Sequence, residues 1–321
     1  MSDTDVLLSV VIPTYNRRST IKRVIQPVLD DSSTGEVVIV VDGSTDGTSE
    51  FLTDWAKVEK RIRVLEQENA GQAAARIHGV KMAQFSTVVL LDDDVEARPG
   101  LITGHARWHS GVSNLVVVGY MPTVIPTPRQ PGQAPTILYS EDYESVCRLY
   151  EADSNAVFTH FWAGNVSMRR SSAIELADLP GERIRYHEDL SFGLRCQLAG
   201  LQPVFDRSLA AQHFHVRNMR GFAEECRLSG ESRAILITRF PAATLELDPF
   251  VTLTSVERMV VKYLAGPCSR RFSARVLMAT CWLTGHCRLW RIETMTARAI
   301  RLIQMTSGYE GVVRTARNVN T

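Results

Sequence analysis

Three adjacent carboxylates, Asp92, Asp93 and Asp94, follow the apolar run at 88–91. Like charges at neighbouring positions repel one another, and the sequence places nothing basic after them until Arg98. Mg²⁺ and Mn²⁺ favour carboxylate, water and phosphate oxygens, and Mg²⁺ is usually held by one or two carboxylates together with substrate phosphates. The cluster is therefore typical of a site where a divalent cation and a diphosphate relieve the repulsion.

Three more polar groups follow apolar runs earlier in the chain: PTYNRR at 13–18, DGSTDGT at 42–48 and NAGQAAARIHG at 69–79. Ligands of open α/β sheets bind beyond the carboxyl ends of the strands, so we expect these groups to converge with the acidic cluster on one edge. Taken singly, each has a structural interpretation. The second group could be only a turn and a helix cap, Arg76 a surface residue, and Asp94 a cap. Four such groups in register favour a ligand site.

The sequence lacks the glycine motifs of two rival nucleotide-binding folds. The segment after the first apolar run reads PTYNRRST, without the G-x-G-x-x-G of dinucleotide-binding folds, and G-x-x-x-x-G-K-[ST] occurs nowhere. Those glycines let the backbone approach a phosphate. A diphosphate would therefore be neutralised in another way, by a metal ion.

The elements expected to position these residues alternate along the first half of the chain. Short β-branched runs predict strands buried on both faces, at 7–12, 37–41, 62–66, 88–92 and 115–120. Windows with helical spacing lie between them, at 19–29, 48–60, 72–84 and 99–109. This alternation predicts an α/β fold with a mainly parallel central sheet flanked by helices.

The second half is less regular. The five prolines of 121–135 predict a loop, which could form a lid on the acceptor side. Further elements are expected in this order: a helix at 137–151, an irregular segment at 158–170, a helix from near Glu188 and a strand at 201–206. Strand signals fade after about residue 240, which predicts a main domain at 1–240 and a C-terminal helical extension at 241–321.

Composition limits the class of protein and its compartment. The 321 residues include 36 basic and 35 acidic side chains, so no global field favours nucleic acid as a partner. Six cysteines form no CxxC pair, as is typical of thiols in a reducing compartment. The N-terminus lacks the features of a signal peptide, and the apolar stretch 276–283 is far shorter than the roughly 20 residues that span a bilayer. We expect a cytoplasmic protein, soluble or peripheral at the inner face of the membrane.

Six segments carry a resemblance to a known family: VVIPTYNR, VDGSTDGT, NAGQAAAR, LLDDDVEARPGL, WAGNVSMRR and HEDLSFGLRCQLAG. Their order resembles that of the inverting family-2 glycosyltransferases of GT-A fold, over about residues 8–230. The resemblance implies a GT-A fold with a Rossmann-like nucleotide-binding half. It also implies transfer of a sugar from a nucleotide-diphosphate donor to an acceptor hydroxyl, with inversion and with Mn²⁺ or Mg²⁺ as cofactor.

Roles at the nucleotide come from the same resemblance. Asp42 would hydrogen-bond the base, Arg76 would approach the base or the diphosphate, and Asp92 and Asp94 match the two acids of the DxD motif, near the ribose and on the metal. Val41 stands where many members carry the first of two acids, and this departure weakens the inference that the nucleotide is UDP. A UDP-sugar is still the first expectation for the donor. The implied nucleotide- and donor-binding residues are Pro13, Thr14, Tyr15, Asn16, Asp42, Gly43, Arg76, Asp92 and Asp93.

The implied catalytic residues are Glu188 and Asp189, with Asp189 as the base that takes the proton of the acceptor hydroxyl. Direct displacement of this kind inverts the anomeric centre and needs no carboxylate nucleophile. A structural interpretation stays open, because the macrodipole of a helix also favours acids at its start.

Two further groups complete the predicted site. His213 and His215 alternate in QHFHVR, so a strand would place both on one face, and the resemblance implies that one of them binds the metal. Both could instead be ordinary, partly buried histidines. Trp162, Gly164 and Asn165 are implied to border the acceptor and the donor sugar, although Trp162 could equally be a core residue.

The segment 269–301 holds seven arginines and one acid, Glu293. Such a basic helical pair could rest on an anionic membrane surface, serve a homodimer, or pack on the main domain with its charges solvated. The acceptor could be a saccharide, a lipid-linked molecule or a small molecule. Two other functions are open: a non-catalytic sugar-nucleotide-binding homologue, against which the HED segment argues, and a nucleotidyltransferase, against which PTYNRRST argues.

Overall fold

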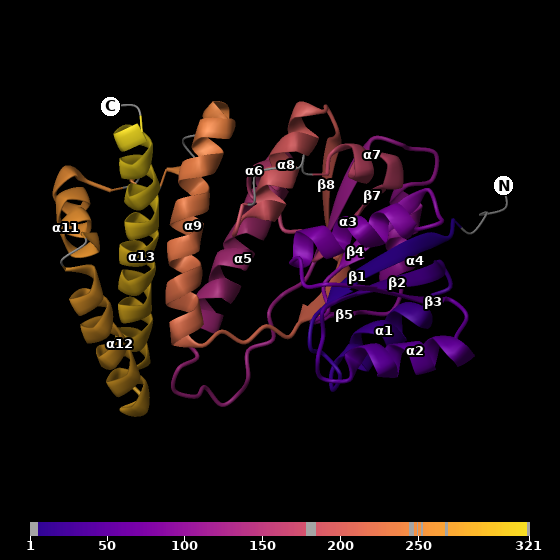
Figure 1. Cartoon of the computed structure of the whole chain (residues 1–321), viewed down its shortest axis with the longest axis horizontal. Coiled ribbons are helices and arrows are strands. Elements are labelled where there is room, and N and C mark those ends of the chain that lie inside the picture. The colour runs from indigo at the N-terminus through magenta and orange to yellow at the C-terminus, as the bar shows by residue number, and fades with distance from the viewer. Residues whose placement is uncertain are drawn as a thin grey trace. The chain divides into compact units, whose positions relative to one another are not determined.

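The structure, a computed structural model, describes residues 6–177, 184–243, 247–248, 250–251, 253–266 and 269–319. The chain divides into two compact units (Figure 1). The first comprises Met1–Val124, Ser145–Pro180 and Phe192–Phe214, and the second comprises Ile125–Glu144, Gly181–Ser191 and His215–Thr321.

An eight-stranded sheet forms the first unit, in the order β3-β2-β1-β4-β7-β6-β8-β5. Its strands are β1 (Leu8–Thr14), β2 (Thr34–Asp42), β3 (Ile62–Gln67), β4 (Thr87–Leu91), β5 (Val95–Ala97), β6 (Leu115–Tyr120), β7 (Asn165–Arg169) and β8 (Gln202–His213). The four strands β1 to β4 pair in parallel, as do β6 and β8, whereas β7 and β5 pair antiparallel with their neighbours. The predicted α/β fold with a central sheet is confirmed.

Helices join the parallel strands because each parallel connection needs a crossover. They are α1 (Ile21–Leu29), α2 (Thr48–Val58), α3 (Gln72–Met82) and α4 (Leu101–Trp108), followed later by the short α6 (Ala156–Thr159) and α7 (Arg170–Glu175). α3 lies close against the sheet at Gly79, where a β-carbon would collide with Val11 and Val40. The apolar side chains of β1, β2 and β4 are buried and form the core of the unit.

The segment expected to be irregular, 158–170, is only partly so, because it contains β7. This strand pairs antiparallel with β4, Leu91 opposite Asn165, and lies in the middle of the sheet. Its pattern is hidden because two of its buried residues, Asn165 and Ser167, are polar. The prediction there was wrong because buried polar side chains can be satisfied by tertiary hydrogen bonds that the sequence does not reveal.

The second unit is helical. Its elements are the first half of α5 (Ala134–Ala152), the first turn of α8 (Glu188–Leu198), α9 (Met219–Arg239), the short 3-10 helix η1 (Pro241–Ala243), α11 (Ser255–Ala265), α12 (Arg270–His286) and α13 (Trp290–Val319). α9 and α13 pack closely where two glycines meet backbone, Gly230 at Met305 and Gly308 at Arg227. A small core of α5, α9, α12 and α13 side chains includes Leu138, Phe222 and Ile300.

The expected C-terminal helices are therefore present, while a domain boundary at 240/241 stays a prediction. Among the described residues, no helix combines the length and the apolar character needed to cross a membrane.

Candidate functional site

The polar strand ends of the first unit converge as predicted. β1, β4 and β2 are adjacent and parallel, so Thr14, Leu91 and Asp42 end on the same edge of the sheet. The acidic cluster follows Leu91 on that edge. Within it, Asp92 accepts hydrogen bonds at one carboxylate oxygen from Nη2 of Arg76 at 2.6 Å and from the side-chain amide of Gln72 at 2.7 Å.

Arg17 is a second cation at this cluster, and the sequence interpretation did not include it. Its Nε donates to Asp93 at 3.1 Å and its Nη2 to Asp94 at 3.5 Å. The residue lies in PTYNRR, directly after the first strand, which is the signal that could have identified it. Although nothing basic follows the carboxylates in the sequence until Arg98, the fold therefore brings Arg17 and Arg76 to them.

Asp93 is held in a strongly perturbed environment. Burial raises the pKa of this carboxyl to about 6, against the opposing effect of Arg17, and Asp94 and Asp92 raise it further. The backbone N–H of Tyr15 also donates to Asp93, at 3.3 Å. A desolvated carboxyl beside two others gains from any additional cation, which supports the predicted location of a metal and a diphosphate.

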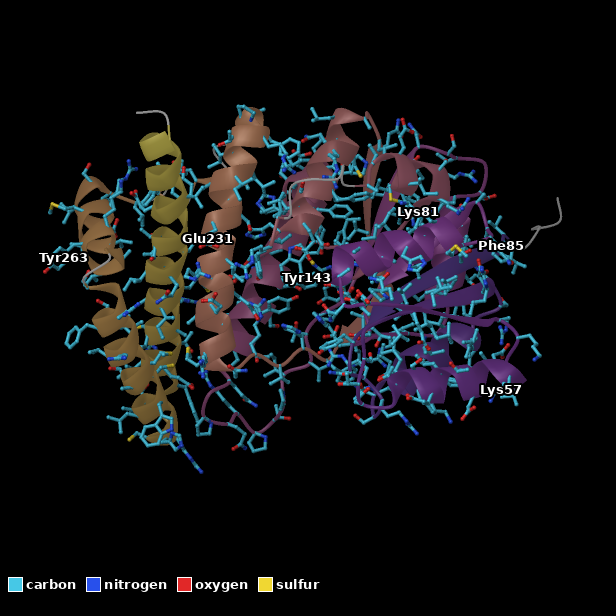
Figure 2. All side chains as sticks on the ribbon, in the orientation of Figure 1. Lys57, Lys81, Phe85, Tyr143, Glu231 and Tyr263 are labelled. Atoms are coloured by element: carbon cyan, nitrogen blue, oxygen red, sulfur yellow. The ribbon has the colours of Figure 1, made fainter. Side chains whose placement is uncertain are left out.

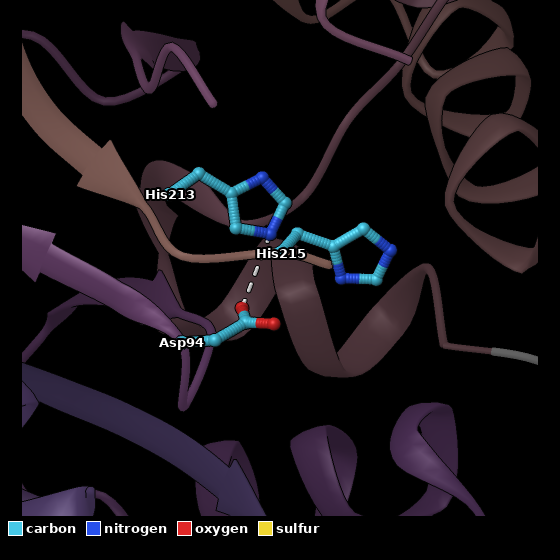
Figure 3. Close-up of side chains that lie close together, drawn as sticks. All are labelled: Asp94, His213 and His215. Atoms are coloured by element: carbon cyan, nitrogen blue, oxygen red, sulfur yellow. Dashed lines mark ion pairs between the residues drawn. The ribbon is translucent and has the colours of Figure 1, made fainter. Parts of the chain in front are cut away.

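Asp94 pairs with a histidine from a distant part of the sequence (Figure 3). Nε2 of His213 lies 3.2 Å from one of its carboxylate oxygens. Two ligands at neighbouring positions of an octahedral ion, each about 2.1 Å from the metal, are about 3.0 Å apart. A carboxylate oxygen and an imidazole nitrogen also suit Mn²⁺-type ions. Asp94 and His213 therefore fit a divalent cation.

His215 occupies a different position from the one expected. β8 ends at His213, so His215 lies beyond the strand, in a segment of the second unit. One ligand atom from each of Asp94, His213 and His215 lies within 4.8 Å of the others (Figure 3). Nε2 of His215, however, accepts a hydrogen bond from Nε of Arg217 at 3.1 Å.

That hydrogen bond fixes the tautomer of His215. Arginine can only donate, so Nε2 of His215 contributes the single lone pair of a neutral imidazole and Nδ1 carries the proton. A ring in this state has no lone pair left for a metal. The arrangement therefore favours His213 over His215 as the ligand.

The second strand end is occupied by a buried aspartate. One carboxylate oxygen of Asp42 accepts from the side-chain amide of Gln67 and the backbone N–H of Ala70, both at 2.8 Å, and the other accepts from the N–H of Gly71 at 2.9 Å. Asp42 is only 4% exposed. In this structure it holds the loop that leads into α3.

Two residues with left-handed backbone shape the neighbouring loops. Gly43 has φ +73° and lies so close to Asn69 that a β-carbon would contact its backbone nitrogen at 2.9 Å. Asn16 has φ +53°, donates its N–H to Ser44 at 2.9 Å and accepts from the N–H of Thr45 at 2.8 Å. These contacts join the loops after β1 and β2.

The remaining predicted nucleotide residues lie at the end of β1. Pro13 and Thr14 are the last two residues of that strand, and both are buried. Tyr15, directly after them, is half exposed and is therefore available to a ligand.

The three residues expected at the sugar separate into different environments. A β-carbon at Gly164 would lie 2.8 Å from both the carboxylate of Asp92 and the sulfur of Met121, so this glycine allows the close approach at the acidic cluster. Trp162 is partly buried. Asn165 is fully buried, and this placement does not support its predicted contact with a sugar.

Asn165 belongs instead to a buried polar network. Its amide donates to the carbonyl of Leu209 at 3.0 Å, and its oxygen lies 2.9 Å from Nε2 of His105. The hydroxyl of Ser167 lies 2.8 Å from a ring nitrogen of His105 and 2.8 Å from one of His109. Burial lowers the pKa of both histidines to about 4, so both are neutral near pH 7.

Glu188 and Asp189 open α8, in the second unit. The residue before them, His187, has φ +64°, and its carbonyl accepts from the N–H of Ser191 at 3.0 Å. Its Nε2 lies 2.7 Å from the hydroxyl of Ser229 on α9. Burial, and then Arg233, lower the pKa of His187 well below its ordinary value. A neutral, anchored histidine thus fixes the turn from which Asp189 projects.

The family model "Glycosyl transferase family 2" matches residues 9–176, a range that contains the acidic cluster and ends before HED. The chain is 41% identical to a putative teichuronic acid biosynthesis glycosyltransferase, TuaG, of Bacillus subtilis, over 29% of this chain and 38% of the relative. It is 38% identical to the undecaprenyl-phosphate 4-deoxy-4-formamido-L-arabinose transferase of Aeromonas hydrophila, over 31% of this chain and 32% of the relative. The matches thus span less than two fifths of either relative.

Solved structures resemble the chain over most of its length. The mannosyltransferase PcManGT of Pyrobaculum calidifontis, in complex with GDP-Man and Mn²⁺, has a TM-score of 0.62 at 17% identity and covers 94% of this chain and 87% of its own. Residues 1–349 of S. aureus TarS, in complex with UDP-GlcNAc, have a TM-score of 0.52 at 16% identity, covering 96% and 92%. At these identities the likeness concerns the fold.

Proposed function

Because this chain belongs to glycosyl transferase family 2, we propose that it is an inverting, metal-dependent enzyme that moves a sugar from a nucleotide diphosphate to an acceptor hydroxyl. Its membership makes it a glycosyltransferase. The metal, the stereochemistry and the roles of individual residues are our proposal. The observation that carries it is the meeting of Asp92, Asp93 and Asp94 with Arg17, Arg76 and His213 at one edge of the sheet.

Asp94 and His213 are the proposed metal ligands, and Mn²⁺ or Mg²⁺ is the proposed ion. The ion would act as a Lewis acid that offsets charge on the leaving diphosphate. Both side chains are largely buried, at 13% and 5% exposure, and are held by the pairing of β5 with β8. A site prepared in this way loses little side-chain entropy on binding the ion.

The donor is proposed to lie along the loops after β1 and β2, against Tyr15, with Arg76 and Arg17 at its phosphates. Two arginines already directed at carboxylates can turn to phosphate oxygens, which a guanidinium also binds. Asp42 would contact the base through the lone-pair capacity that its three hydrogen bonds leave.

The proposal does not assign the nucleobase of the donor. Of the two structural neighbours, one binds GDP-Man and the other UDP-GlcNAc, and Val41 replaces an acid at the position where many members carry one. A UDP-sugar stays the first expectation. The acceptor is proposed to be a saccharide or a lipid-linked molecule, in keeping with the named relatives.

Asp189 is the proposed general base. As the acceptor oxygen bonds to the anomeric carbon, its proton passes to this carboxylate, and the bond from the anomeric carbon to the diphosphate oxygen breaks with its electron pair on the diphosphate. One displacement of this kind inverts the anomeric centre. The acid also lies in the first turn of α8, a position at which helices commonly carry acidic residues.

A donor screen tests the proposal. We expect slow hydrolysis of one donor among UDP-, GDP- and dTDP-sugars, dependent on Mn²⁺ or Mg²⁺, and its loss in Asp94→Ala. A donor that stabilises the protein only with the metal, but is never hydrolysed or transferred, would favour the non-catalytic homologue. Release of inorganic pyrophosphate from a nucleoside triphosphate would favour a nucleotidyltransferase.

A further inference from the structure

α12 turns large apolar side chains away from its own unit. Phe272 is 72% exposed and Trp282 65%, and Val276 and Leu283 are also exposed. The four lie at positions that fall on one stripe of a helix with 3.6 residues per turn. The opposite face buries Ser273, Cys281 and Thr284. The helix thus exposes a second apolar face besides the one that packs inward, where Cys281 and Leu277 join the small core of the unit.

α11, which packs against α12 and α13 (Figure 1), repeats this arrangement. Its exposed apolar residues are Val256, Met259, Val260 and Tyr263, spaced by three and four positions along one face. Tyr263 is 75% exposed and lies on the outer side of the helix (Figure 2). Scattered single apolar residues are normal on a surface, but two neighbouring helices with continuous outward stripes mark a binding surface.

The same region carries cations and almost no acids. Residues 255–292, which include α11 and α12, contain seven lysines and arginines and one acid, Glu257. Arg271 and Arg275 are exposed on α12 beside the apolar stripe. The next acid, Glu293, is fully buried and pairs with Arg129, so it does not offset these charges at the surface.

We propose that the outward stripes of α11 and α12 dock on the surface of an anionic lipid bilayer. An interfacial helix of this kind places Trp, Phe and aliphatic side chains at the level of the headgroups, while arginines beside them reach the lipid phosphates. Each basic residue near an anionic leaflet strengthens binding about fivefold. The inference goes beyond the proposed glycosyl transfer and does not rest on it.

A second copy of the chain is a less favourable occupant of this surface. A twofold dimer uses the same patch on both subunits, so two segments with an excess of basic residues would face each other. Like charges brought together at an interface oppose association. An anionic bilayer supplies both the complementary charge and the apolar depth.

Vesicle flotation of the full chain tests the proposal. The probe is phosphatidylcholine vesicles with or without about a third phosphatidylglycerol. We expect flotation only with the anionic vesicles and a blue shift of tryptophan emission, which Phe272→Ser/Trp282→Ser removes. Arg271→Gln/Arg275→Gln should weaken binding about thirtyfold. Matched controls on the first unit are Val58→Ser/Leu198→Ser, which alters residues 81% and 77% exposed, and Lys57→Gln/Lys60→Gln.

Three outcomes would overturn the proposal. One is failure of the wild-type chain to float with anionic vesicles, and another is equal loss of flotation in the control variants. The third is a twofold mass in light scattering that the α12 substitutions halve, without vesicle binding, since this would assign the face to a second copy. Donor hydrolysis measured on the same preparations, without vesicles, reports separately on the proposed function and should be unchanged in all four variants.

Discussion

Nε2 of His213 faces Asp94 at 3.2 Å because the antiparallel pairing of β5 with β8 sets Val95 directly opposite His213. The N–H of Phe214 also donates to the carbonyl of Asp94, at 2.8 Å. Backbone hydrogen bonds on both sides of the pair therefore determine the separation of the two proposed ligands. His215 is not held by strand pairing in this way, because β8 ends two residues earlier, at His213.

This difference predicts unequal effects of the two histidines on metal binding. Asp94→Ala and His213→Ala should each weaken Mn²⁺ binding at least tenfold, because each removes a ligand. His215→Ala should weaken it less than threefold, because the hydrogen bond from Arg217 already occupies the lone pair of that ring. Titration of each variant with Mn²⁺, followed by electron paramagnetic resonance of the free ion, measures the affinities. Equal losses in both histidine variants would contradict the tautomer argument.

The contact between His187 and Ser229 predicts that a residue remote from the acids affects turnover. Asp189→Asn should lower kcat by about 10²–10⁴, the usual range for a general base. Ser229→Ala should lower kcat several-fold with KM for the donor unchanged, because His187 loses its partner and the turn before Asp189 loosens.

Substitutions of His187 distinguish the role of its backbone conformation from the role of its imidazole ring. His187→Gly permits φ +64° but lacks the imidazole, and His187→Asn tolerates this conformation and keeps a polar side chain. We expect Asn to retain more activity than Gly. If Asp189→Asn is inactive while Ser229→Ala and His187→Gly match the wild type, Asp189 acts without this support.

The strands that carry the site could be predicted because they are buried on both faces. β1, β2 and β4 each contain a continuous run of Val, Ile or Leu, and each ends at or directly before the polar residues that the sequence indicated. β7 could not be found in this way, since Asn165 and Ser167 on it are buried polar residues whose partners, His105 and His109, lie about sixty positions away.

The site shows the same limit. Asp92, Asp93 and Asp94 were identified from their own sequence, but the arginine that contacts two of them precedes them by about 76 positions. Asp42 was predicted to face a base, and its three hydrogen bonds to the loop before α3 could not be foreseen. Residue type and order predict which groups gather at a strand end, whereas tertiary contacts decide which of them are already occupied.

The buried histidines predict that acid destabilises the protein. The pKa of His105 and of His109 is about 4 in the folded state, against 6.5 for an ordinary histidine. Since the folded pKa is lowered, their contribution is complete above pH 6.5 and is lost as the pH falls toward 4, while the unfolded chain takes up protons. Between pH 7 and pH 5 each should cost about 2 kcal/mol of unfolding free energy.

Urea unfolding at the two pH values measures this loss. His105→Gln/His109→Gln should flatten the dependence, because glutamine keeps a hydrogen-bonding group and does not titrate. His187 adds a loss of the same sign in the second unit, so the dependence should not vanish. His286→Gln, on the exposed surface of α12, is the control for the loss of a histidine side chain. An unaltered slope in the double variant would show that other groups cause it.

The proline-rich loop is anchored within the second unit, which predicts that its anchor matters for stability. Glu293 is fully buried and accepts hydrogen bonds from Nη2 of Arg129 at 2.7 Å and from the N–H of Gly132 at 2.8 Å. These contacts attach the loop at Arg129 and Gly132 to the start of α13. A lid that swings as a whole is therefore not expected, and any movement should be limited to residues before Arg129. Removal of one partner of a buried ion pair leaves the other charge uncompensated, so Glu293→Gln should lower the free energy of unfolding by about 3 kcal/mol.

The exposed pair between Arg298 of α13 and Glu141 of α5, at 2.9 Å, supplies the matched control. Glu141→Gln should cost less than about 1 kcal/mol, since solvent screens both charges. Chemical unfolding of both variants compares the two costs, and limited proteolysis shows whether cleavage increases within 121–133 in Glu293→Gln alone. Equal costs, or a loop no more readily cleaved in Glu293→Gln than in the wild type, would mean that other contacts hold this segment and that its closure as a lid has to be considered again.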